Sequence, residues 1–146
     1  MKMKVPFVKL HPDAMMPTYG SACAAGADLY ALSGEEILIP AGKTVFVSTG
    51  IAMEIPEGFV GLVFARSSMG AKRNLAPANK VGVIDSDYRG EIRVVLFNHG
   101  QQEQTVQHGE RIAQMIITPV LTPAYAETED LTDTDRGAGG FGSTGK

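Results

Sequence analysis

The chain lacks the features that mark secreted, membrane-spanning and disulfide-linked proteins. It has a single cysteine, Cys23, and no tryptophan among 146 residues, so no disulfide can form within the chain. It contains no run of 18 apolar residues, which argues against a membrane-spanning helix. Two early lysines are followed by no apolar stretch, so we expect no secretory signal. These absences favour a cytoplasmic protein with no membrane partner.

Positive charge is also scarce. The chain has 13 lysines and arginines against 16 acidic residues, which gives a net charge of −3 and a pI near 5.6. Proteins that coat nucleic acids or membrane surfaces present a basic face, and this balance argues against both partners. The length suits one domain, and a hydrophobic fraction of 44% is enough for a buried core.

Long stretches with helical periodicity are missing, and 17 glycines and eight prolines divide the chain into short apolar runs. The runs recur roughly every ten residues between turn residues and are rich in valine, isoleucine and phenylalanine, which is typical of strands. One short helix is predicted over 67–73. We therefore expect an all-β, jelly-roll-like barrel or sandwich. The predicted strands cover residues 5–10, 27–32, 36–39, 44–48, 51–55, 59–65, 80–84, 91–98, 104–107 and 111–119.

The character of the sequence changes after Pro119. The stretch "TPAYAETEDLTDTD" is acidic and has little to bury, so it cannot offset its own ordering entropy. A glycine-rich stretch follows it. We expect a β-barrel body over residues 1–120 and a flexible C-terminal arm over 121–146, both within one domain.

The terminal stretch "RGAGGFGSTGK" matches the start of a Walker A phosphate-binding loop, yet no helix can follow it to complete the usual corner. Its glycines tolerate positive φ and let the backbone approach an anion closely. The hydroxyls of Ser143 and Thr144 and the charge of Arg136 suit phosphate groups. Phe141 could cover a flat base. A glycine-rich tail without a binding role is the alternative, and this stretch alone leaves both readings open.

A second unusual stretch is "GVIDSDYRGEI", at residues 82–92. It places Asp85 and Asp87 in a loop between two predicted strands, with Ile84 and Tyr88 beside them. A carboxylate in such a setting could act as a general base that orients or deprotonates a water molecule. Tyr88 could pack its flat face on a sugar or a base. The alternative is an ordinary polar hairpin tip.

Three further stretches carry candidate residues. "FARSSMGAKRN" places Arg66, Ser67 and Ser68 at the start of the short helix, which suits either an anion site or simple serine capping. Asp28, in "AAGADLYA", must find a donor or a cation, and a hydrogen-bonded structural role is favoured over metal ligation. Gln114, in "GERIAQMII", is expected to face solvent. The three histidines have no metal-ligand spacing.

In content and order, these stretches resemble the five motifs of the trimeric dUTPase family: AGADL, RSSMG, GVIDSDYRGEI, GERIAQMII and RGAGGFGSTG. Together they span nearly the whole chain. The resemblance implies a homotrimer of jelly-roll-like barrels with three active sites, each assembled from three subunits. It also implies hydrolysis of dUTP to dUMP and pyrophosphate with Mg²⁺ on the triphosphate. That reaction keeps uracil out of DNA and supplies dUMP for dTMP synthesis.

The resemblance assigns roles to individual residues as well. Asp85 would activate the water that attacks the α-phosphorus, and Asp28 would hold the waters of the metal ion. Tyr88 would pack under the deoxyribose and exclude a 2′-hydroxyl. Asn79 and the backbone near Val83 would read the edge of uracil. Phosphate contacts would come from Arg66, Ser67, Ser68, Gly70 and Gln114, while the arm of another subunit would supply Phe141 over uracil and Arg136, Gly142, Ser143 and Thr144 to the phosphates.

Two alternatives remain. A dCTP deaminase, alone or bifunctional, shares the fold implied by the resemblance but carries a glutamate where this chain has Asp85, and ammonia release from dCTP would favour it. A nucleotide-responsive binding or signalling protein could be built on the same scaffold. The complete set of motifs argues against lost chemistry and leaves an added partner role open.

Overall fold

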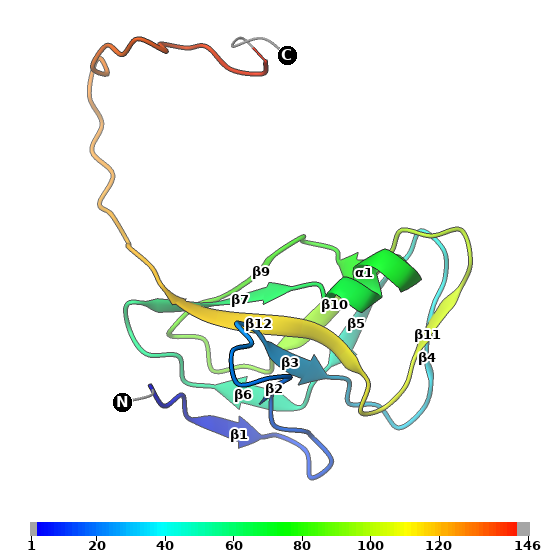
Figure 1. The fold of residues 1–146 in the computed structure, drawn as a ribbon. Coiled ribbons are helices and arrows are strands. Elements are labelled where there is room, and N and C mark those ends of the chain that lie inside the picture. Colours follow the sequence, from blue (N-terminus) through cyan, green and yellow to red (C-terminus); the bar gives the residue numbers. More distant parts are fainter. Residues whose placement is uncertain (1–2, 143–146) are drawn as a thin grey trace.

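Residues 3–142 are described by the structure, a computed structural model, and they form twelve strands and one short helix (Figure 1). Within this part of the chain, no helix has the length and apolar character needed to cross a bilayer. The expected all-β fold with one short helix is confirmed. The elements are β1 (Phe7–Lys9), β2 (Thr18–Tyr19), β3 (Ala27–Tyr30), β4 (Ile37–Ile39), β5 (Thr44–Ser48), β6 (Ile51–Met53), β7 (Phe59–Phe64), α1 (Ser67–Arg73), β8 (Leu75–Pro77), β9 (Gly82–Ile84), β10 (Arg93–Asn98), β11 (Gln104–Val106) and β12 (Arg111–Pro119).

Antiparallel pairing joins the strands into a five-stranded sheet, β2-β3-β12-β7-β9, a three-stranded sheet, β5-β10-β8, and two strand pairs, β1-β6 and β11-β4. Successive side chains of a strand point to opposite faces, and β10 accordingly buries Val94, Leu96 and Asn98 but exposes Arg93. Buried side chains of both larger sheets meet in one core. Two packed layers of antiparallel strands around a single core make the fold jelly-roll-like.

The strand bounds differ from the sequence-based expectation in two ways. Strands β5 and β12 and the helix α1 have the predicted bounds, while the other predicted strands are one or two residues too long at one end, or at both ends for β1. The strands β2 and β8 were not predicted. β2 has only two residues, and β8 contains Pro77, which removes a backbone donor. β8 tolerates this proline because it is an edge strand that pairs only with β10.

The chain leaves the body at the end of β12. The backbone N–H of Val120 donates to the carbonyl of Gly58 at 2.9 Å, and residues 121–138 are then exposed and form no helix or strand. Figure 1 shows this segment running away from the sheets. Leu121, Tyr125 and Leu131 are each at least 90% exposed, so this segment builds no core of its own. A functional arm over 121–146 stays a prediction.

A buried asparagine connects the three-stranded sheet with the β11-β4 pair. Asn98 is fully buried at the end of β10. Its Nδ2 donates to the carbonyls of Ile39 at 2.9 Å and Gln102 at 2.8 Å, and its Oδ1 accepts the N–H of Gly100 at 2.9 Å. One side chain therefore satisfies three backbone groups that would otherwise lose their partners inside the fold.

Replacing Asn98 with alanine should lower the free energy of unfolding by about 2–4 kcal/mol, because buried backbone groups would lose their partners. Denaturant unfolding of the variant checks this expectation. Gln101→Ala, an exposed change in the same loop, is the matched control and should change the free energy by less than about 0.5 kcal/mol. Equal stability of the two variants would contradict the assigned role of Asn98.

Candidate active site

Asp85 lies in a loop that crosses from one larger sheet to the other. It directly follows β9, which pairs only with β7, and the loop ends at β10, which pairs with β5 and β8. β9 and β10 are not hydrogen-bonded to each other, so the sequence-based interpretation as a hairpin tip is wrong. Inside the loop, the N–H of Tyr88 donates to the Asp85 carbonyl at 3.2 Å, and Arg89 Nη1 donates to the Ser86 carbonyl at 2.7 Å.

Asp85 borders an open cavity of about 210 Å³. Phe46 and Val83 are 62% and 60% exposed beside it, and the guanidinium of Arg93 lies 5.2 Å from the centre of the Phe46 ring. The cavity therefore combines a carboxylate with apolar and aromatic walls, as small-molecule sites commonly do. Its lining residues are Phe46, Val83, Ile84, Asp85, Tyr88, Glu91, Arg93 and Val95.

Tyr88 forms one wall of this cavity and is held in place by its own loop. Its hydroxyl donates to the Glu91 carbonyl at 2.9 Å, and its side chain remains 44% exposed. A Cβ atom added at Gly90 would lie 2.6 Å from Tyr88 Cζ. Only glycine at position 90 leaves the ring where it is, which explains the Tyr-x-Gly spacing in this stretch.

A second, smaller cavity of about 80 Å³ lies between β9 and β10. Asn79, Gly82 and Val83 line one part of it, and Arg93 and Val94 line another. β9 is the edge strand of its sheet, so the side of β9 that faces away from β7 has no strand partner. An unpaired strand edge presents backbone donors and acceptors in a row. A flat ring with donors and acceptors along its edge could bind there.

Asp28 is buried in β3 between two arginines. Arg66 Nε lies 2.7 Å from Asp28 Oδ1, and Arg111 Nη1 lies 3.4 Å from Oδ2. The residue is 8% exposed. A buried carboxylate requires such partners, and the preference for a paired, structural aspartate over a direct metal ligand agrees with this geometry. Within residues 3–142, no group of three or more acidic, histidine or cysteine side chains is arranged to hold a metal ion.

The residues next to Asp28 form a polar cluster on β12 and α1. Gln114 pairs with Asp28 in the β12-β3 register and donates from Nε2 to the Ala65 carbonyl at 3.0 Å, so it is half-buried and does not simply face solvent. Arg66 Nη1 donates to Ser68 Oγ at 3.3 Å. Arg66 itself occupies the N-cap of α1 without a side-chain cap, so the interpretation of the serines as caps is wrong. Ser67 and Ser68 are exposed.

The Asp85 cavity and the Asp28 cluster lie at opposite ends of β7. Gln114, beside Asp28, pairs with Phe64 at the end of β7, whereas Ile84, beside Asp85, pairs with Gly61 near its start. A strand rises about 3.3 Å per residue, so the two groups are separated by roughly 10 Å along β7 before the spacing between strands is added. One chain does not bring all the candidate residues together.

The arm residues of this chain lie apart from both groups. Arg136 Nε donates to the carbonyl of Gly139 within the arm at 2.8 Å. Phe141 is fully exposed with φ of 51°, and Gly142 has φ of 92°. Ser143 and Thr144 lie outside the described residues. The positive φ of Gly142 is one that glycine adopts freely. Within residues 3–142, no hydrogen bond or ion pair joins the arm to the side chain of Asp85 or Asp28.

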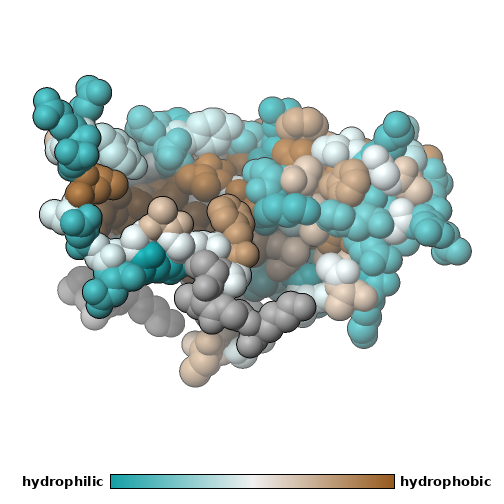
Figure 2. Space-filling model, turned by 90° about the horizontal axis from the view of Figure 1, so that it is seen from above, coloured by the Kyte–Doolittle hydropathy of each residue, from teal (hydrophilic) through white to brown (hydrophobic). Residues whose placement is uncertain are grey.

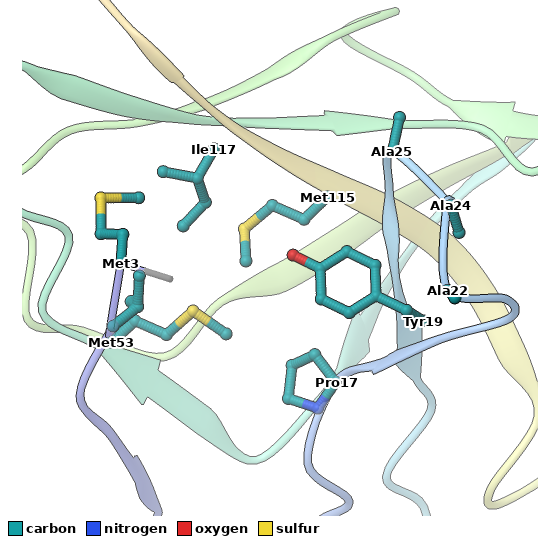
Figure 3. Close-up of a pocket in the computed structure, with 10 residues that line it drawn as sticks. Met3, Pro17, Tyr19, Ala22, Ala24, Ala25, Met53, Met115 and Ile117 are labelled. Carbon is teal, nitrogen blue, oxygen red and sulfur yellow. The ribbon is translucent and has the colours of Figure 1, made fainter. Parts of the chain in front are cut away.

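Hydrophobic residues also gather on the surface, where the view from above shows a brown hollow bordered by hydrophilic residues (Figure 2). One such place is a cavity of about 450 Å³ between the N-terminal segment and β12. Met3, Met53 and Met115 point into it, together with Tyr19 (Figure 3). None of its lining residues is acidic or basic, so this cavity lacks the groups that hydrolysis requires.

Sequence reasoning missed two charged residues at the site. Arg111 contacts Asp28 from a position 83 residues away, and the carboxylate of Glu91 accepts the N–H of Gly50 from 41 residues away at 2.8 Å. Both stand inside the quoted stretches, so their place in the motifs was a usable signal. Their partners are determined by which strands pair and where the chain turns back, and the spacing of residues in the sequence does not predict either.

Comparison with known proteins places the chain in a family. The dUTPase family model matches residues 12–145. The deoxyuridine 5′-triphosphate nucleotidohydrolase of Desulfitobacterium hafniense is 46% identical over 145 residues, covering 99% of this chain and 96% of that protein. That of Nautilia profundicola is 44% identical over 144 residues, covering 99% and 100%.

Solved structures agree with this assignment. The dUTPase of Staphylococcus bacteriophage 80alpha with dUPNHPP superposes with a TM-score of 0.90 at 26% identity, covering 99% of this chain and 100% of that one. The G164S variant of the same phage enzyme with dUpNHpp gives a TM-score of 0.89 at 25% identity, with 99% and 100% covered. A match over nearly the whole length, in both sequence and fold, means that the chain belongs to the dUTPase family.

Proposed function

We propose that this chain hydrolyses dUTP to dUMP and pyrophosphate. Membership of the dUTPase family supports the proposal, because relatives at 44–46% identity carry the name deoxyuridine 5′-triphosphate nucleotidohydrolase. The similar phage dUTPase binds dUPNHPP, an analogue of dUTP. The observation that carries the proposal is the cavity in which the exposed carboxylate of Asp85 stands beside Tyr88. The role in the cell would be to keep uracil out of DNA, in the cytoplasm, and to supply dUMP for dTMP synthesis.

Asp85 acts in this proposal as the general base. Its side chain is exposed, and none of the ion pairs within residues 3–142 involves it, so the carboxylate is available to a water molecule. The carboxylate takes a proton from the water as the water oxygen bonds to the α-phosphorus. The bond from that phosphorus to the bridging oxygen breaks, and pyrophosphate leaves. Phosphoryl transfer depends mainly on such positioning and on charge stabilisation.

Tyr88 and the gap between β9 and β10 supply selectivity for the nucleoside. Tyr88 packs under the deoxyribose, so that a 2′-hydroxyl on ribose would meet the ring. The edge of uracil bonds to Asn79 and to the backbone near Val83, in the cavity of about 80 Å³. In this proposal, the methyl group of thymine would clash with the wall that reads the edge of uracil.

The phosphates bind in this proposal to residues of a second subunit. Arg66, Ser67, Ser68, Gly70 and Gln114 belong to the group that lies roughly 10 Å along β7 from the Asp85 side. Arg66 donates one N–H to Asp28 and one to Ser68. A guanidinium has five N–H donors, so the remaining donors can bind phosphate oxygens. Because one chain separates the two groups, a homotrimer that apposes them across a subunit interface completes the site.

The arm of a third subunit closes the site. Phe141 is fully exposed, and an aromatic side chain at that position gains burial only by covering a ligand or another chain. It covers the uracil ring, while Arg136, Gly142, Ser143 and Thr144 reach the phosphates. Closing excludes bulk water and fixes the leaving group, so the arm acts as a lid.

Mg²⁺ fits this site only through the substrate and water. Both oxygens of Asp28 already bond to arginines, but a carboxylate has about four lone-pair sites and can still accept hydrogen bonds from the waters of a metal ion. Mg²⁺ keeps several waters and binds through substrate phosphates in many enzymes. When bound, it would neutralise charge on the phosphate oxygens, and Asp28 would orient its waters.

One assay separates this function from its alternatives. Pyrophosphate release is measured with dUTP, UTP, dCTP and dTTP in the presence of Mg²⁺. The proposal expects release from dUTP far above the other three. Ammonia release from dCTP would instead identify a deaminase, and nucleotide binding without any turnover would identify a binding protein.

Asp85→Asn should keep the affinity for dUPNHPP and lower kcat for dUTP by about 10²–10⁴-fold, the range expected for loss of a general base. Calorimetry and single-turnover kinetics measure the two quantities. Asp87→Asn removes another exposed carboxylate from the same loop and should leave kcat nearly unchanged. A near-normal rate for Asp85→Asn would show that Asp85 is not the general base.

Tyr88→Ala should lower the preference for dUTP over UTP by about tenfold or more, because the wall that rejects a 2′-hydroxyl is gone. The ratio of the two kcat/KM values is the measurement. Phe46→Ala, which removes another aromatic side chain from the lining of the cavity, should leave the ratio close to that of the unaltered protein. Unchanged discrimination in Tyr88→Ala would contradict the position assigned to its ring.

Deleting residues 135–146 should leave a folded trimer whose kcat/KM for dUTP falls by at least about a hundredfold, because the lid and its phosphate contacts are absent. Light scattering checks the assembly, thermal unfolding checks the fold, and steady-state kinetics measures the loss. If the shortened trimer turns over dUTP at the original rate, the glycine-rich end is a tail without a role in the reaction.

A further inference from the structure

We propose that Glu91 is a positioning residue for substrate selectivity. Its carboxylate and its carbonyl connect the ring of Tyr88 to the turn between β5 and β6, and this connection keeps the ring where it rejects ribose. The inference rests on the proposed function, in which Tyr88 packs under the deoxyribose. Glu91 itself reaches no reacting atom in this account and acts only through Tyr88.

The carboxylate of Glu91 is bound to a rigid turn. Oε1 accepts the backbone N–H of Gly50 at 2.8 Å, and Oε2 accepts the hydroxyl of Ser48 at 3.5 Å. Gly50 has φ of 67°, and a Cβ atom there would lie 2.7 Å from Leu32 and 2.8 Å from Ala14. The turn is thus packed against the body and has little freedom to move, so it gives the carboxylate a fixed anchor.

The carbonyl of the same residue holds the aromatic ring. Tyr88 Oη donates to the Glu91 carbonyl at 2.9 Å, and Gly90, which has no Cβ atom, leaves room for the ring. The next residue, Ile92, is buried and forms two hydrogen bonds with the same turn region. Its N–H donates to the carbonyl of Ile51 at 2.8 Å, and its carbonyl accepts a hydrogen bond from Thr49 Oγ1 at 2.5 Å. The loop therefore stays attached when the carboxylate is removed, while the backbone at Glu91 gains freedom.

The other charged contact from this loop to the body is weak. Arg89 Nη2 lies 3.7 Å from Glu54 Oε1, and the two side chains are 54% and 62% exposed. Exposed ion pairs of this kind contribute little to stability. The half-buried bond from Glu91 to Gly50 is the stronger constraint. Glu54→Gln is consequently a matched control, since it removes an acidic contact with the same loop and spares Tyr88.

Selectivity against a hydroxyl group by steric exclusion needs a wall that does not yield. A ring that shifts by a fraction of an ångström makes room for the 2′-hydroxyl of a ribose, while the affinity for deoxyribose changes little. Freeing Glu91 should therefore act on the ratio between ribose and deoxyribose substrates. Binding and turnover of dUTP itself should change little.

The experiment compares Glu91→Ala, Glu91→Gln and Glu54→Gln with the unaltered trimer. It measures kcat/KM for dUTP and UTP and, independently of turnover, the affinities for dUMP and UMP by calorimetry. In Glu91→Ala, both ratios should fall roughly five- to tenfold, with kcat for dUTP changed by less than about threefold. Glu91→Gln should recover most of the selectivity, because its amide oxygen can still accept the N–H of Gly50.

A double variant with Tyr88→Phe tests the route. Tyr88→Phe removes only the hydroxyl that bonds to the backbone carbonyl of residue 91, so its effect on selectivity should be smaller in Glu91→Ala than in the unaltered protein. Losses that multiply independently would overturn the inference, as would an unchanged ratio in Glu91→Ala or equal losses for dUMP and UMP. If Glu91→Ala does not fold, Glu91→Asp keeps the charge, loses the reach to Gly50 and should show the same loosened ratio.

The same measurements test the proposed function and the role of Glu91 separately. An unaltered protein that does not hydrolyse dUTP or prefer it to UTP would sink the proposed function. An unaltered protein that does both, with a Glu91→Ala variant that discriminates equally well, would sink only the role of Glu91.

Discussion

The site depends on one constraint: the chain passes from β9 to β10 without pairing these strands to each other. β9 bonds to β7 in one sheet, and β10 bonds to β5 and β8 in the other. The gap between them has an unpaired strand edge and Asn79 on its border, and the loop that spans it carries Asp85 and Tyr88. A paired hairpin would close the gap and satisfy its backbone groups internally. The proposed binding surface therefore depends on the absence of pairing between β9 and β10.

The second constraint is electrostatic and sits at the other end of β7. Asp28 is buried and must be neutralised, and Arg66 and Arg111 do so from two different strand ends. This pairing fixes Arg66 at the start of α1, next to the exposed Ser67 and Ser68. Because these groups and Asp85 are apart on one chain, the proposed site is shared between chains, and each barrel would contribute two separate parts of it.

The sequence predicted the fold class, the helix and most strands, because period-two apolar runs and glycine turns act locally. It also pointed to Asp85, Tyr88 and Gly90 through motif spacing alone. It could not predict that Ser67 and Ser68 leave α1 uncapped, or that Gln114 bonds to a carbonyl on the neighbouring strand, because these outcomes depend on register between distant segments. The partners of Glu91 and Arg111 were hidden for the same reason.

The decisive measurement is a crystal structure of the assembled protein with dUPNHPP and Mg²⁺. The proposed mechanism predicts that a carboxylate oxygen of Asp85 lies within hydrogen-bond distance of a water in line with the α-phosphorus, with uracil between β9 and β10. It also predicts that Arg66 from a different chain contacts the phosphates. A nucleotide bound with Asp85 out of reach of that water, or bound entirely by one chain, would contradict it.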